Sequence, residues 1–144
     1  MLYRMQEGTL TLDGEWQDKS VNVLVPQGMS QGMNLVVSRD VLPPGMGLSD
    51  YLRQQKKVFQ DELAAFRFRA DEPAEIDGRH GSLLEFEWDN QGSLVHQLMV
   101  VIQDKEQVLS MTATAPGGID DTVRQVMLAA MRSFTFAETA GTAP

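Results

Sequence analysis

The segment Leu94–Gln103 is apolar at most positions, which predicts a strand that is buried on both faces. Successive side chains of a strand point to opposite faces, so a strand with one face in water alternates apolar and polar residues. Here both sets are largely apolar: Leu94, Leu98, Val100 and Ile102 in one, and Val95, Met99 and Val101 in the other. The sheet that contains this strand therefore needs a cover on each side.

Only two segments have the spacing of amphipathic helices. The first runs from a cap at Ser49 or Asp50 to about residue 65, and the second spans about 119–132, with Asp120 and Asp121 where the helix dipole favours negative charge. If both helices pack on one face of the sheet, a second subunit or a bound client must cover the other face. This reasoning favours a protein that binds something over one that catalyses.

The other segments alternate as strands do, and turn residues separate them. The predicted strands are 3–12, 19–25, 33–42, 66–69, 81–89, 94–103 and 108–115, with a short terminal strand at 133–136. We expect the three from 81 to 115 to form a meander at the centre of the sheet. The fold class predicted is α+β, a largely antiparallel sheet with two helices.

A chain of 144 residues without an internal linker predicts a single domain over 1–136 and a disordered tail at 137–144. The net charge is −8 and no basic block occurs, which argues against nucleic acid and anionic membranes as partners. The chain has no cysteine, which excludes disulfides and thiolate sites. Its first residues lack the apolar core of a signal peptide, so we expect a cytoplasmic protein.

Residues that could carry chemistry do not form a known catalytic motif, so we predict no enzyme activity, no catalytic residues, no metal site and no cofactor. His80 and His96 are interpreted as structural histidines, since no further ligand has suitable spacing. Glu85, Glu87 and Asp89 alternate along one strand and are interpreted as a solvated stripe. A small hydrolase that uses Glu85, Glu87 or His96 is the catalytic alternative.

A series of short phrases occurs in order along most of the chain. These are Ile76-Asp77-Gly78, the acidic strand Leu84–Trp88, the turn Asn90–Gly92, His96-Gln97-Leu98, Leu109–Pro116, an amphipathic helix and Ser133-Phe134. In this order and in its length, the chain resembles the Eag family of small cytoplasmic chaperones of the bacterial type VI secretion system, within a wider DcrB/PsbP-like group.

The resemblance implies a PsbP-like α/β sandwich that forms a homodimer. It also implies a client: a toxin effector with a PAAR domain, whose N-terminal transmembrane segments the chaperone shields before the effector is loaded on the secretion spike. The membrane would be contacted only through the client's helices. The alternative is a non-enzymatic PsbP-like interaction module that binds a soluble protein partner.

We expect the client to bind a groove on one sheet face that is rich in apolar residues with interleaved polar groups. The residues predicted for this groove are Asn22, Leu24, Val36, Ser38, Leu98, Val100 and Ile102. Val21, Val23 and Val25 are expected to pack under the helices. The alternative for each groove residue is an ordinary place in the core.

Overall fold

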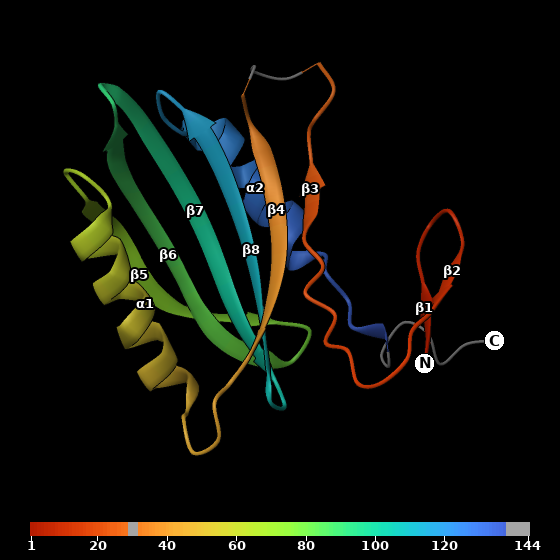
Figure 1. The fold of residues 1–144 in the computed structure, drawn as a ribbon. Helices are drawn as coiled ribbons and strands as arrows, with labels where there is room; N and C mark the ends of the chain where they lie inside the picture. The colour runs from red at the N-terminus through yellow and green to blue at the C-terminus, as the bar shows by residue number, and fades with distance from the viewer. Residues whose placement is uncertain (29–31, 138–144) are drawn as a thin grey trace.

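The computed structural model describes residues 1–28 and 32–137 and contains four strands, a helix, four strands and a second helix, as Figure 1 shows. In chain order they are β1 (Leu2–Arg4), β2 (Thr9–Thr11), β3 (Asn22–Leu24), β4 (Asn34–Val41), α1 (Leu48–Glu62), β5 (Arg67–Ile76), β6 (Arg79–Asn90), β7 (Ser93–Asp104), β8 (Gln107–Pro116) and α2 (Asp121–Arg132).

Strands β3 to β8 form one antiparallel sheet in the order β3-β4-β8-β7-β6-β5. The predicted meander of β6, β7 and β8 lies inside this sheet, and β7 is paired along both sides. Strands β1 and β2 form a separate hairpin. The predicted fold class, α+β with a largely antiparallel sheet and two helices, is confirmed.

The two helices pack on opposite faces of the sheet (Figure 1). On one face, the ring of Phe59 in α1 stacks on Phe86 of β6 with 5.1 Å between centroids. On the other face, Met131 of α2 packs in a cluster with Leu98 and Val100 of β7. The condition under which a second subunit or a client would have to cover a whole face, both helices on one side, is therefore not met.

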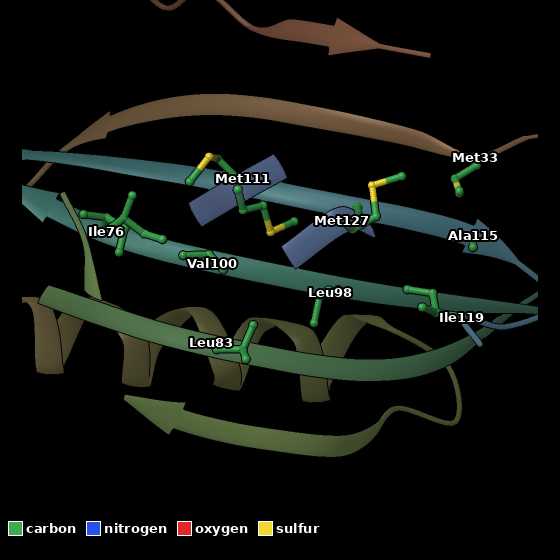
Figure 2. Packing of buried hydrophobic residues seen from close by; sticks show 12 residues of the cluster. Met33, Ile76, Leu83, Leu98, Val100, Met111, Ala115, Ile119 and Met127 are labelled. Carbon is green, nitrogen blue, oxygen red and sulfur yellow. The ribbon is translucent and has the colours of Figure 1, made fainter. Parts of the chain in front are cut away.

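The main core lies between the sheet and α2. Figure 2 shows side chains from β6, β7 and β8, among them Leu83, Val100 and Met111, on the same side of the sheet as Met127 of α2. Methionine fills irregular gaps because its side chain is unbranched and flexible. Met111 and Met127 are both nearly inaccessible to solvent, in agreement with methionine as a core residue here.

A smaller core lies between the sheet and α1. Leu52 is buried with Val101 of β7 and Val108 of β8. Leu42, which follows β4 in the chain, packs in the same cluster. This explains why β7 is apolar on both faces. Even-numbered residues such as Leu98 face α2, and Val101 faces α1.

The N-terminal region differs most from the sequence-based expectation. The predicted strand at 3–12 is instead the hairpin of β1 and β2, because the chain turns between Met5 and Gly8. Val21, Val23 and Val25 do not pack under a helix and are 55%, 59% and 61% exposed. They lie on or beside the edge strand β3, where neither helix buries them.

The C-terminal region also differs in part. Residues 133–136, which were expected to form a strand, follow α2 without joining the sheet. The predicted tail at 137–144 lies, from residue 138 on, outside the described residues. The single-domain boundary at 136 stays a prediction.

Replacing Leu98 by alanine is expected to lower the free energy of unfolding by about 2–5 kcal/mol, since the side chain is 0% exposed and its removal leaves a cavity. Leu24→Ala is the matched control, because Leu24 is on the same face but 55% exposed, and we expect a change within about 0.5 kcal/mol. Urea denaturation measures both values. Equal effects at the two positions would contradict the assignment of Leu98 to the core.

Candidate functional site

Helix α1 leaves part of its face of the sheet uncovered. Across β7, β8, β4 and β3, strand register places Met99, Thr112, Val36 and Val23 in one row. These side chains and their neighbours on the same face are half-buried, or exposed in the case of Val23. We call this surface the open face. It comprises Val23, Asn34, Val36, Ser38, Gln97, Met99, Thr112 and Thr114.

Polar side chains cross the open face in a hydrogen-bonded row next to its apolar residues. Trp88 of β6 donates from Nε1 to Oε1 of Gln97 at 2.8 Å, and Gln97 donates from Nε2 to Oγ1 of Thr114 at 3.0 Å. Asn34 lies opposite Thr114 on β4, and its Oδ1 atom is buried without a hydrogen-bond partner among the described residues. Because a buried acceptor without a partner is costly, this oxygen contributes unfavourably to the free energy of folding.

The seven residues predicted for the groove do not share one surface. Residues directly opposite each other in an antiparallel pair point to the same face, and Asn22 and Leu24 lie opposite Val37 and Leu35, which pack in the core under α2. Val36 and Ser38 point the other way, onto the open face.

The same alternation corrects the β7 part of the prediction. Leu98, Val100 and Ile102 are at most 2% exposed and lie in the core against α2. The groove prediction is therefore wrong in its geometry, because the register of β3 and β4 separates the two pairs and α2 covers the β7 residues. Contact of a client with Asn22, Leu24, Val36 or Ser38 stays a prediction.

A second candidate site is a cluster of buried charges at the start of α2. Glu85 of β6 is 6% exposed and accepts two hydrogen bonds from Arg124 of α2, from Nε at 2.9 Å and from Nη2 at 2.6 Å. Nε2 of His96 lies 2.6 Å from Oε2 of the same carboxylate. An arginine that binds both oxygens of a carboxylate gives a strong, oriented pair. The cluster links α2 to the neighbouring strands β6 and β7.

The hydrogen bonds of His96 fix its protonation state. Its Nδ1 accepts from the backbone N–H of Ile119 at 2.8 Å, so the proton of the neutral ring is on Nε2 and is donated to Glu85. Burial lowers the pKa of His96, although the Glu85 carboxylate acts in the opposite direction. Burial raises the pKa of Glu85, but the hydrogen bonds from Arg124 and His96 outweigh it, so that this pKa is lowered.

Glu87 completes the buried charges, and it also corrects the interpretation of a solvated stripe. Glu87 is 3% exposed and forms ion pairs with Arg67 and with Arg69 of β5. A β-bulge leaves Arg69 without an opposite residue in the β5–β6 ladder, although its side chain pairs with Glu87. Of the three acidic residues on this strand, Asp89 alone is exposed.

The cluster of buried charges is suited to a structural role. Both oxygens of Glu85 and both nitrogens of His96 are occupied by protein groups, which leaves them no free atom for a substrate. No group of acidic and histidine side chains that could hold a metal occurs in residues 1–28 and 32–137. Sequence reasoning missed Arg124, although its spacing from Asp121, with which it also pairs, places it on the first turns of a helix.

Between pH 7.5 and 5.5 we expect the free energy of unfolding of the wild type to fall. The unfolded chain binds a proton at His96 below about pH 6.5, while the folded chain, with a lowered pKa, resists it. His96→Gln offers one donor and one acceptor but does not titrate, so we expect a shallower pH dependence in urea denaturation. His80→Gln, at an exposed histidine, is the control and should keep the wild-type slope. An unchanged slope in His96→Gln would refute the role given to this ring.

Comparison with known proteins finds relatives by sequence and by structure. A curated protein of Pseudomonas aeruginosa named Effector EagT6 is 29% identical over 115 residues, which is 78% of this chain and 80% of that protein. A crystal structure of a P. aeruginosa protein, PA94, described as of unknown function and a putative regulator, has a TM-score of 0.75 and 25% identity, with 94% of this chain and 96% of that one covered.

A further likeness concerns the fold alone. The solution structure of cyanobacterial PsbP from Synechocystis has a TM-score of 0.54 and 18% identity, covering 77% of this chain and 79% of that one. This agrees with the PsbP-like sandwich expected from the sequence. Neither helix in the described part of the chain has the length and apolarity to cross a membrane. The model of the DcrB family matches residues 7–133, and the chain therefore belongs to the DcrB family.

Proposed function

We propose that this protein is an Eag-type chaperone of the type VI secretion system. It is a cytoplasmic, non-enzymatic homodimer that binds and shields the N-terminal transmembrane segments of a PAAR-containing toxin effector and assists its loading on the secretion spike. The likeness to Effector EagT6 over most of both chains supports the link to an effector. The observation that carries the binding role is the open face, a part of the sheet that the chain's own helices leave uncovered.

The open face suits an apolar helix because large side chains lie there beside polar ones. A transmembrane helix in water exposes many large apolar side chains, and each gains roughly 1.5–3 kcal/mol when it is fully buried. Val36 and Met99 offer apolar contact, and both are only partly buried in the free chain. Methionine adapts its shape to different partners, which suits a surface that must accept a helix of variable sequence.

The polar row of the open face supports the same proposal. Transmembrane helices often associate through small residues and through hydrogen bonds of serine, threonine and asparagine, because lipid offers these groups no partner. Gln97 and Thr114 are only partly buried and can provide such bonds to a client. A client helix on this face would therefore find both kinds of contact that a neighbouring membrane helix provides.

A charge placed at Val36 is expected to abolish binding of the client and leave the fold intact. Val36 is partly exposed in the free chain, but a carboxylate at the centre of the open face would lose its water when an apolar helix covers it. The experiment co-expresses tagged Val36→Glu with a fragment of the effector that contains its apolar N-terminal segment, and measures how much soluble fragment is retained. We expect a loss of at least tenfold.

The matched control is Val126→Glu, the same substitution at a valine of α2 that is 47% exposed and away from the open face. It should retain the fragment as the wild type does. If the wild type fails to keep the apolar fragment soluble, the proposal is refuted. If it instead retains only a soluble region of its partner, the alternative of a PsbP-like interaction module takes its place.

A further inference from the structure

The edge strand β3 leaves one side of its backbone without a partner strand. It pairs with β4 over only three residues, and nothing in the described part of the chain pairs with its outer side. Val21, Val23, Leu24 and Val25 are each 55% to 61% exposed. An exposed apolar strand edge is a template for a further strand.

The two edges of the six-stranded sheet differ in how well they are protected against pairing with a further strand. Strand β5, at the other edge, carries Arg67, Arg69, Asp71, Glu72 and Glu75, a proline at 73 and a bulge. Charges, proline and bulges are the features by which proteins prevent edge-to-edge pairing. Between Ser20 and Pro26 the β3 edge has no charged residue. Of the two edges of the six-stranded sheet, the β3 edge is thus the one suited to pair with another chain.

We propose that the β3 edge pairs with the β3 edge of a second copy, in antiparallel register about a two-fold axis at Val23. The inference rests on the homodimer in the proposed function and specifies how it is built. In this register Val21 lies opposite Val25 of the other copy, and Asn22 lies opposite Leu24. Lys19 then faces Gln27, so that no like charges meet across the axis. A two-fold interface has to be self-complementary in this way.

The N-terminal arm, residues 1–20, adds to the same interface. Figure 1 shows its β1–β2 hairpin beyond the β3 edge, on the side away from the rest of the sheet. Leu2 and Trp16 are 65% and 59% exposed, and Met1, Met5 and Leu10 are exposed as well. A stable dimer buries about 800 Å² on each partner, which is more than a five-residue edge supplies. The arm provides the additional apolar surface.

Pairing at this edge would give the open face the length of a membrane helix. In one chain the open face spans β7, β8, β4 and β3, which is about 14 Å at ~4.8 Å between strands. Two copies joined at β3 make eight adjacent strands, or about 34 Å. A membrane-spanning helix of ~20 residues is about 30 Å long. Val23 lies on the open face, so the row of side chains that it forms with Val36 and Thr112 would continue into the second copy.

Single cysteines test the interface directly, since the wild type contains none. In the proposed register Val23→Cys lies opposite itself, so a short bis-maleimide should convert most of the protein to a covalent dimer on a denaturing gel. Glu75→Cys is the control on the β5 edge. The side chain at 75 and the residue at 23 are both 59% exposed. We expect Glu75→Cys to remain uncrosslinked at the same concentration.

Equal crosslinking of the two variants, or none at Val23→Cys, would overturn the inference. Val23→Lys gives a second readout, because it places two like charges at the axis and changes only an exposed residue. Its mass by light scattering should fall from twice 16.0 kDa to 16.0 kDa. A monomeric wild type would also overturn the inference. Retention of the effector fragment by the wild type tests the proposed function separately, whatever the crosslinking result.

Discussion

The buried contact of Glu85 with Arg124 and His96 determines how this fold presents its surfaces. A carboxylate is rarely buried without partners, and here Glu85 is bound by Arg124 of α2 and by His96 of β7. The ring of His96 in turn accepts from the backbone N–H of Ile119, just before α2. Removing one partner would leave a charge uncompensated, so α2 is held across this face in a fixed position. With α2 fixed over one face and α1 over part of the other, the open face lies beyond the cover of α1.

This division of the two faces also explains the composition of β7. The strand is apolar on both sides because α2 covers Leu98 and Val100, and α1 covers Val101. Gln97 and Met99 face the same side as Val101 but lie toward the open face, where the cover of α1 ends. One strand therefore contributes to the main core, to the second core and to the proposed binding surface. The position of each residue along β7, relative to α1 and α2, determines whether it joins a core or the open face.

Most of the fold could be predicted from the sequence, but the site could not. The apolar pattern of 94–103 and the turn residues beside it were sufficient for the meander, because alternation is a local property. The assignment of faces depends on register between β3 and β4, which alternation within each strand leaves open by one residue. In the structure Leu24 lies opposite Leu35. A shift of one residue in this register would put Leu24 opposite Val36 instead, which is the arrangement that the predicted groove requires. Likewise, the partner of Glu85 is 39 residues away, beyond the reach of local patterns.

A surface that binds apolar helices has to remain soluble while it is empty, and the polar row of the open face meets this requirement. A large continuous apolar patch would associate with itself. Gln97 interrupts the apolar residues and has its amide satisfied by Trp88 and Thr114, so its polar atoms incur no penalty without a client. In the proposed function, the same row limits self-association of the empty surface and offers polar contacts to a client.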